Sequence, residues 1–303
     1  MSRTVPRRHP TRRGFASSCA LLIGLRKASI DSQTILITGC SSGIGRATAL
    51  CAHERKHTTV ATARKLESLD DLPESIHKVA LDVTEPASVT EAMRSVTATL
   101  GAPTALVNNA GYAEVGPVEL VPHDRVEREF ETNVYGPLRM IRACLPAMRE
   151  AGSGTIVNVS SLAALISAPF MGVYCASKAA LEAYSDSLRL ELRSSGINVA
   201  LIEPGPIRTR FSETAFGDAR ERWLDNPDNP YAAGMQRTVR LMDKLTRVEA
   251  EASDVAATII GAIENPHPKA RYPVSVPAHV LPALLGVVPT RLQDKLSERI
   301  LGL

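Results

Sequence analysis

The segment TILITGCSSGIG, residues 34–45, decides the fold of this chain. Its first five residues are β-branched or aliphatic and predict a buried strand. Gly39, Gly43 and Gly45 then allow a tight turn into a helix whose free N–H groups attract a pyrophosphate. A strand, a glycine-rich turn and a helix in this order are typical of a dinucleotide-binding βαβ unit, although a glycine trio alone is weak evidence.

Strand and helix patterns alternate along the rest of the chain. The predicted strands cover residues 34–38, 59–63, 78–83, 105–108, 155–159, 198–202 and 272–276. The predicted helices cover residues 45–54, 88–100, 123–133, 136–149 and 174–194. Such alternation implies right-handed βαβ units. We therefore expect an α/β fold with a Rossmann-type doubly wound parallel sheet, in a single domain over residues 32–276.

Three stretches lie outside this rhythm. Residues 1–31 form a basic leader that we expect to be disordered or to precede the true start, with a targeting peptide as the alternative. Residues 206–235 are rich in charge, Pro and Asn and predict a long mobile substrate loop. Residues 277–303 predict a C-terminal helical tail, in which Thr290 and Gln293 would form the N-terminal cap of the last helix.

Charge and cysteine content exclude several classes of function. The formal net charge is +3, but residues 1–30 hold seven basic and no acidic residues, which leaves about −4 on residues 31–303. A nucleic-acid groove needs clustered basic residues on the folded body, so we predict no nucleic-acid partner. The five cysteines form no C-x-x-C pair, which predicts reduced thiols, no metal site and a cytoplasmic protein.

The end of the second predicted strand bears on cofactor choice. Arg64 lies nineteen residues after Gly45, where an NAD site carries an acid for the ribose 2′-hydroxyl. A guanidinium binds a 2′-phosphate with paired hydrogen bonds, so Arg64 favours NADP(H) over NAD(H), unless it is an ordinary solvated arginine. Asp82 and Asn109 end the next two strands and could contact the adenosine, or could merely serve turns.

A second group of residues indicates acid–base chemistry. Tyr174 and Lys178 are four residues apart on a predicted helix and share one face. A nearby ammonium stabilises a phenolate, so we expect Lys178 to lower the pKa of Tyr174 and make it a usable acid and base. Ser161, or its neighbour Ser160, ends the fifth strand and could bind the substrate oxygen; the two should face opposite ways.

Taken in order, these motifs resemble the classical short-chain dehydrogenase/reductase family from about Gln33 to Tyr272. The matching segments are Thr38 to Gly45, Asn108 to Gly111, Asn133, Ser161, Tyr174 with Lys178, and Pro204 to Thr209. The resemblance implies that Tyr174 is the proton donor and acceptor, that Lys178 holds the nicotinamide ribose, and that Ser161 positions the substrate. It also implies that Asn133 anchors a proton-relaying water and that Ile207 and Thr209 bind the carboxamide. The expected cofactor-binding residues are Gly39, Ser41, Ser42, Gly43, Ile44, Gly45, Arg64, Asp82, Val83, Asn109, Ala110, Gly111, Tyr174, Lys178, Pro204, Gly205, Ile207 and Thr209.

The substrate is less constrained by the residues. The stretch 173–192 is more similar to the hydroxysteroid and retinol dehydrogenase branch than to the ketoacyl reductases. We therefore expect a hydrophobic carbonyl or alcohol such as a steroid, retinoid or lipid-like ketone. The alternatives are a 3-ketoacyl-thioester reductase and a non-catalytic NADP(H)-binding sensor. The resemblance also implies a homodimer or homotetramer, whereas peripheral membrane contact is compatible with the apolar tail but is not predicted.

Overall fold

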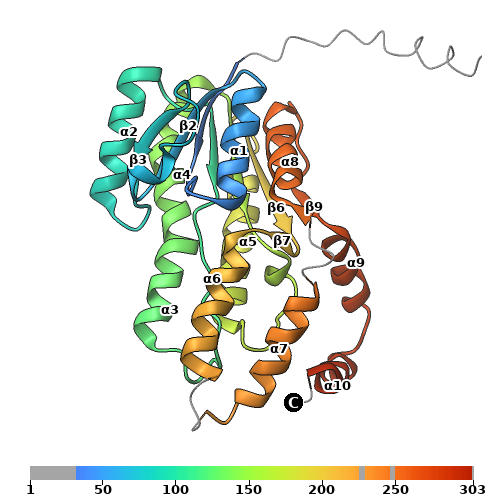
Figure 1. Cartoon of the computed structure of the whole chain (residues 1–303). Helices are drawn as coiled ribbons and strands as arrows, with labels where there is room; N and C mark the ends of the chain where they lie inside the picture. Colours follow the sequence, from blue (N-terminus) through green and yellow to red (C-terminus); the bar gives the residue numbers. More distant parts are fainter. Residues whose placement is uncertain (1–31, 225–228, 246–249, 302–303) are drawn as a thin grey trace, which may run out of the picture. The chain divides into compact units, whose positions relative to one another are not determined.

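A seven-stranded parallel sheet forms the centre of the computed structural model, which describes residues 32–224, 229–245 and 250–301 (Figure 1). The strand order is β3-β2-β1-β4-β5-β6-β9. These strands are β1 (Thr34–Ile37), β2 (Thr58–Ala63), β3 (His77–Ala80), β4 (Ala105–Asn108), β5 (Gly154–Val159), β6 (Ile197–Pro204) and β9 (Arg271–Val274). All seven predicted strands are confirmed to within a few residues, and the predicted leader lies outside the described residues.

The strand order changes direction between β1 and β4. The chain goes from β1 outward through β2 to β3, then returns to pair β4 with the other side of β1. Ile35, for example, pairs with Thr59 on one side and Ala105 on the other. Open parallel sheets bind ligands at the carboxyl ends of the strands that flank such a switch point. The fold therefore places a binding crevice after Ile37 and Asn108.

Helices cover both faces of the sheet, as we predicted. The helices of the described residues are α1 (Gly43–Glu54), α2 (Pro86–Leu100), α3 (His123–Phe130), α4 (Gly136–Ala151), α5 (Gly172–Glu191), α6 (Arg210–Ala219), α7 (Ala232–Leu245), α8 (Ala252–Glu264), α9 (Val276–Leu285) and α10 (Thr290–Leu301). Along β1, Ile35 and Ile37 pack on the face covered by α1 and α8, whereas Leu36 packs with α2 and α4 on the opposite face. This alternation follows from the two-residue period of a strand. Of these helices, α6, α7 and α8 were not predicted.

Short irregular helices complete the chain. They are the 3₁₀ helices η1 (Leu66–Leu69) and η3 (Leu162–Ala164) and the π-helical turns η2 (Glu131–Tyr135) and η4 (Arg220–Leu224). A small second ladder pairs β7 (Ile207–Arg208) with β8 (Ala250–Glu251).

The prediction of a long mobile loop over residues 206–235 is wrong for the described part. Helices α6 and η4 and the beginning of α7 occupy most of it. Trp223 explains the difference, because its indole N–H donates to the Val115 carbonyl at 2.9 Å and its ring is buried in a cluster with Ala219 and Met235. Contacts with residues far away in sequence therefore order a segment whose composition is that of a loop.

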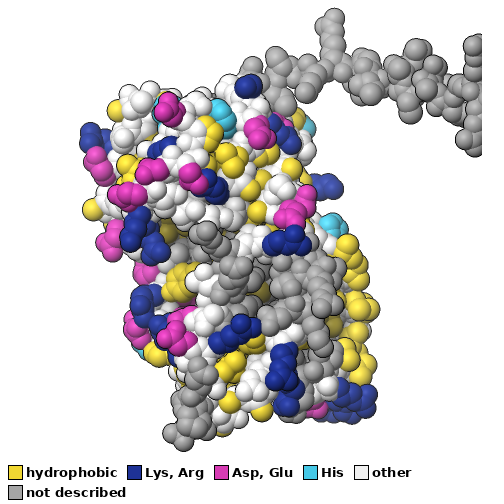
Figure 2. Space-filling view, viewed as in Figure 1, with side chains coloured by type: hydrophobic (Ala, Val, Ile, Leu, Met, Phe, Trp, Pro, Cys, Tyr) yellow, Lys and Arg dark blue, Asp and Glu magenta, His cyan; other side chains and the backbone are white. Residues whose placement is uncertain are grey.

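The C-terminal tail is helical, as predicted, but its cap is not the predicted one. Gln293 Nε2 donates to the carbonyls of Leu285 and Val288, at 2.9 and 2.7 Å, and so ties α10 to the end of α9. Hydrophobic side chains gather along the edge that α9 forms (Figure 2). Leu284 and Leu292 are 54% and 57% exposed, so much of the tail's apolar surface is open to solvent in the monomer.

Candidate functional site

The turn between β1 and α1 has the geometry of a phosphate cradle. Gly39 and Gly43 both have positive φ angles, +74° and +58°, which side chains rarely adopt. A Cβ atom at Gly45 would collide with the carbonyl oxygen of Gly39 and with Nδ2 of Asn109. The glycines therefore let the backbone fold closely on itself, with the first N–H groups of α1 left open.

Asn109 braces this turn from the neighbouring strand. Its Nδ2 donates to the carbonyls of Thr38 and Gly39, at 2.8 and 3.1 Å. The Thr38 hydroxyl accepts from the backbone N–H groups of Asn109 and Ala110. Asn109 thus serves the turn, as one of the two predicted roles had it, and it also lines the cleft beside this turn.

One cleft of about 1880 Å³ runs from the glycine-rich turn to the predicted catalytic residues. Seventeen of the eighteen predicted cofactor residues line it, and Gly45, which is packed beneath the turn, is the exception. Ser161, Tyr174 and Lys178 line the same cleft, whereas Asn133 lies behind its wall. The fold has therefore brought together residues that are up to 170 positions apart, from Gly39 to Thr209.

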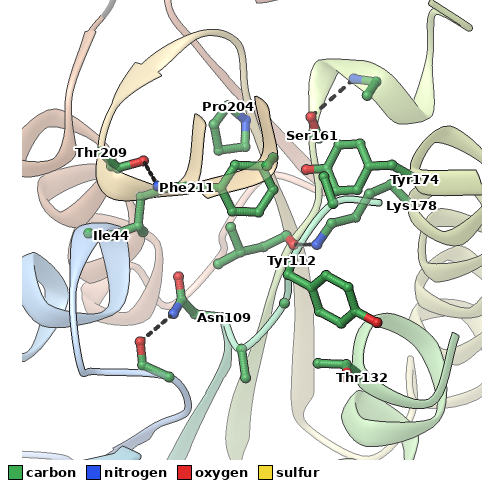
Figure 3. Close-up of a pocket in the computed structure, with 18 of the residues that line it drawn as sticks. Ile44, Asn109, Tyr112, Thr132, Ser161, Tyr174, Lys178, Pro204, Thr209 and Phe211 are labelled. Carbon is green, nitrogen blue, oxygen red and sulfur yellow. Dashed lines mark hydrogen bonds between the residues drawn. The ribbon is translucent and has the colours of Figure 1, made fainter. Parts of the chain in front are cut away.

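Ser161, Tyr174 and Lys178 point toward one another in the cleft (Figure 3). The Ser161 hydroxyl forms a hydrogen bond with the Tyr174 hydroxyl, which favours the phenolate. Lys178 Nζ lies 5.9 Å from the centre of the Tyr174 ring and donates to the Val159 carbonyl at 2.9 Å. Ser160 is buried and its side chain lies near Glu182, so Ser161 is the serine that faces the tyrosine.

The pKa of Tyr174 differs from our prediction. We expected the Lys178 ammonium to lower it, but burial raises the pKa of Tyr174 and outweighs the hydrogen bond from Ser161. Burial also lowers the pKa of Lys178 to about 8, against the attraction of the acidic side chains of Glu129 and Glu182. Burial therefore decides the pKa of Tyr174, and the predicted lowering by Lys178 is absent.

Asn133 lies in the π-helical turn η2 and is completely buried. Its Oδ1 accepts from the Tyr112 backbone N–H at 3.1 Å, and its Nδ2 lies within hydrogen-bond distance of the Tyr112 carbonyl, the Glu129 carboxylate and the Ser177 hydroxyl. The amide therefore holds the loop after β4 against α5. Its predicted role of anchoring a water stays a prediction.

The adenosine end of the cleft contains one predicted and one unpredicted cation. A side cavity of about 510 Å³ is lined by Ser41, Ala63, Arg64, Lys65 and Ser68. Within the described part of the chain, neither Arg64 nor Lys65 has an ion-pair partner for its side chain. Sequence reasoning missed Lys65, although its position directly after Arg64 could have indicated it. Asp82, in contrast, uses Oδ1 to accept from the N–H and hydroxyl of Thr84, at 2.9 and 2.8 Å, as in an ordinary turn.

Apolar side chains line the cleft together with Tyr174. The centre of the Phe211 ring lies 5.7 Å from that of the Tyr174 ring, and Met171 and Ile166 line the same cleft. Val280 and Leu281 of α9 line it too. Sequence reasoning had assigned none of these residues to the site, because nothing in their spacing relates them to Tyr174.

Comparison with known proteins places this architecture in a family. Residues 33–219 match the family model described as short chain dehydrogenase. The chain is 36% identical to the uncharacterized oxidoreductase YbbO of Escherichia coli K12 over 273 residues, covering 89% of this chain and 95% of that protein. It is 34% identical to the 3-ketodihydrosphingosine reductase of Bacteroides thetaiotaomicron, covering 83% of this chain and 91% of the relative.

Solved structures agree with this placement. A short chain dehydrogenase from Burkholderia cenocepacia in complex with NADP matches with a TM-score of 0.68 and 26% identity, covering 88% of this chain and 98% of the other. A short chain dehydrogenase/reductase from Burkholderia phymatum in complex with NAD matches with a TM-score of 0.70 and 26% identity, covering 88% and 95%. The chain therefore belongs to the short-chain dehydrogenase family of oxidoreductases, which act on CH–OH groups with a nicotinamide cofactor.

Proposed function

We propose that the protein is an NADP(H)-dependent oxidoreductase that interconverts a carbonyl and an alcohol on a hydrophobic substrate such as a steroid, retinoid or lipid-like ketone. The observation that carries the proposal is the shared cleft. The Tyr174 hydroxyl, the Ser161 hydroxyl and the Lys178 ammonium open into the same space as the glycine-rich turn. A nicotinamide held by that turn supplies or accepts the hydride.

Each of the three polar side chains has a distinct task in this proposal. Tyr174 donates its phenolic proton to the carbonyl oxygen during reduction and removes a proton from the alcohol during oxidation. Its raised pKa keeps the phenol protonated at neutral pH, which suits the reducing direction. Ser161 donates a hydrogen bond to the substrate oxygen as negative charge develops there. Lys178 holds the cofactor's ribose from the floor of the cleft.

The preference for NADP(H) rests on Arg64 and Lys65. Both line the side cavity at the end of β2 and lack an ion-pair partner among the described residues. Two cations without an anionic partner can form ion pairs with the dianionic 2′-phosphate of NADP(H). The 2′-hydroxyl of NAD(H) carries no charge with which they could pair. Solved structures of the same fold hold either NADP or NAD, so the fold does not indicate which cofactor is preferred. The proposed preference for NADP(H) therefore depends on Arg64 and Lys65.

Two observations support the proposal of a hydrophobic substrate: the apolar side chains of the cleft and the name of one relative. Phe211, Met171 and Leu281 offer no charge for a polar substrate to pair with. The 3-ketodihydrosphingosine reductase to which the chain is similar is named for a long-chain lipid ketone. We expect a comparable substrate here, with its chain lying along α9.

Two further expectations accompany the proposal. The four described cysteines are all free thiols, which supports a cytoplasmic location. No helix among the described residues has the length and apolarity to cross a bilayer. Exposed Tyr184 and Leu190 on α5 support a homodimer or homotetramer formed through this helix and α4, which size-exclusion chromatography with light scattering can check.

The decisive experiment is a titration with NADPH and NADH followed by a carbonyl panel. We expect NADPH to bind at least about tenfold more tightly, because one charged hydrogen bond contributes roughly 1.5–3 kcal/mol. With NADPH, long-chain ketones and steroid or retinoid carbonyls should be reduced faster than small polar ketones. Turnover confined to small polar ketones would refute the substrate class, and equal affinity for both cofactors would refute the cofactor preference.

A further inference from the structure

A buried carboxylate lies directly behind the catalytic side chains and has no part in the mechanism above. Glu129, on the last turn of α3, is 0% exposed. Its Oε1 accepts from Asn133 Nδ2 at 3.2 Å and lies 3.4 Å from the Ser177 hydroxyl, and its Oε2 accepts from the Glu114 backbone N–H at 3.1 Å. A carboxylate is rarely buried without a cation to pair with it.

The nearby arginines are occupied elsewhere. Arg125 pairs with Glu114 and Asp218, and Arg128 pairs with Asp124. None of the described lysines or arginines forms an ion pair with Glu129. Its partners are therefore neutral donors, and its charge acts on groups beyond them.

The groups that feel this charge are the catalytic ones. Burial raises the pKa of Glu129 to about 8, and Lys178 and the Glu114 N–H pull it back. In turn the charge on Glu129 raises the pKa of Lys178 and that of Tyr174, although burial is the larger influence on both. The titratable or charged groups around Glu129 are Arg125 and Arg128 on its own helix, Tyr112 and Glu114 on the loop after β4, and Tyr174, Cys175 and Lys178 on α5.

Geometry links Glu129 to the same residues. Ser177 immediately precedes Lys178, and its hydroxyl donates its one proton to the Tyr174 carbonyl at 2.8 Å. Asn133, which Glu129 contacts, also bonds Ser177 at 3.0 Å. The contacts among Glu129, Asn133 and Ser177 thus hold the first two turns of α5, from which Tyr174 and Lys178 project.

We propose that Glu129 is a positioning residue of the active site, which sets the protonation of Tyr174 and Lys178 through its charge and fixes their helix through Asn133 and Ser177. The inference rests on the proposed function. It assigns to a residue of α3 the control of the pH range over which the Tyr174–Lys178 pair works.

The test compares Glu129→Gln with Glu127→Gln, a control on the same helix whose side chain is 65% exposed and pairs with His123. The measurement is kcat/KM for carbonyl reduction as a function of pH. Removal of the negative charge lowers the pKa of both Tyr174 and Lys178, so both lose their protons at lower pH. The alkaline limb of the profile should therefore move down by on the order of one pH unit in E129Q, and should stay in place in E127Q.

A second readout does not depend on activity. Glu129 has an ordinary pKa of 4.5 when unfolded and about 8 when folded, so its protonated form stabilises the protein below about pH 4.5 and this stability is lost as the pH rises through 8. The Tm of the wild type should fall relative to that of E129Q between pH 5 and pH 9. E127Q should track the wild type throughout.

The outcomes separate the two proposals. An alkaline limb that does not move in E129Q overturns the inference, even if kcat falls, because a merely structural anchor would act in that way. A wild-type protein that reduces no carbonyl refutes the proposed function, and the Tm comparison then decides whether Glu129 carries a buried, pH-dependent charge. If E129Q does not fold, Glu129→Asp replaces it in the test. This variant keeps the carboxylate but moves it away by one methylene, so the alkaline limb of kcat/KM should shift in the same direction by a smaller amount. An alkaline limb that does not shift in Glu129→Asp overturns the inference.

Discussion

At the scale of single residues, burial shifts the pKa values of Tyr174 and Lys178 in opposite directions. Burial raises the pKa of the phenol and lowers the pKa of the ammonium to about 8, because in both cases it disfavours the charged form. The pair therefore favours a protonated tyrosine beside a lysine that loses its charge in mild alkali. In the proposed function, the tyrosine hydroxyl therefore exchanges the proton, and the lysine mainly binds the cofactor.

Replacement of Tyr174 by Phe tests this assignment. The substitution removes one hydroxyl and keeps the ring, so reduction should fall by about 10²-fold or more while NADPH binding stays within about twofold. Steady-state kinetics and a fluorescence titration measure the two quantities. Tyr135→Phe, at a tyrosine that is 44% exposed and does not line the cleft, is the matched control and should leave both unchanged. Turnover retained in Tyr174→Phe would remove the tyrosine from the mechanism.

Arg64→Gln tests the second residue-scale assignment. Loss of the guanidinium should weaken NADPH binding by about 10- to 100-fold and leave NADH binding nearly unchanged, because only NADPH carries the 2′-phosphate. Isothermal titration with each cofactor gives the ratio. Arg94→Gln on α2, where the arginine pairs with Glu91 at the surface, should have no effect on either. An equal loss for both cofactors would mean that Arg64 does not recognise the phosphate.

At the scale of elements, the beginning of α1 depends on what surrounds it. Gly45 is in a helix, where glycine is normally unfavourable, yet it lies against the carbonyl of Gly39 and the amide of Asn109. The close approach of α1 to the turn after β1 requires the missing side chain. The same closeness directs the helix N-terminus at the cleft.

Two alanine substitutions separate this requirement from helix propensity. Gly45→Ala should lower the free energy of unfolding by about 1–3 kcal/mol, because backbone and a clamped amide must move to admit the methyl group. Gly261→Ala, in α8 with no atom within 4 Å of its added Cβ, should instead be neutral or raise it by about 0.5–1 kcal/mol. Urea denaturation measures both. Equal effects would contradict the proposed close contact.

At the scale of the whole molecule, a charged cluster connects the last strand to the catalytic helix. Arg271 on β9 binds Asp186 at 2.6 Å and Glu182 at 3.0 Å on α5, and its Nε lies 3.0 Å from Glu203 on β6. Burial, with repulsion from Glu182, raises the pKa of Glu203 to about 7 despite this arginine. The edge strand, the central sheet and α5 are thus joined by one cation shared among three acids.

The stability of this cluster should depend on pH. Stability from protonated Glu203 is fully present below its ordinary pKa of 4.5 and is lost as the pH rises through about 7. Arg271→Gln leaves the acids without their cation, which matters most when they are ionised. We expect the variant to be destabilised by about 1–3 kcal/mol at pH 8, since part of Arg271 stays in water, and by clearly less at pH 5. Thermal unfolding of both proteins at the two pH values checks this; an equal gap would contradict it.

The sequence by itself determined the βαβ alternation, the seven strands of the main sheet and most of the cofactor-binding motifs that line the cleft. These patterns are local: buried strands are apolar and β-branched, and a phosphate turn needs its glycines within a few positions. The four predicted catalytic residues stand in short motifs for the same reason, which is why Ser161, Tyr174 and Lys178 could be placed together before any coordinates existed.

Only the tertiary structure decided the rest. Helices α6 and η4 form in a segment with a loop-like composition because Trp223 is buried against a distant loop. The pKa of Tyr174 rises because burial, which no spacing reveals, outweighs the charge of a neighbour. Glu129 lies beside the catalytic pair although about fifty residues separate them, and Phe211 meets Tyr174 across the cleft. Burial and contacts between distant segments arise only when the chain is folded, so they control the site without leaving a pattern in the sequence.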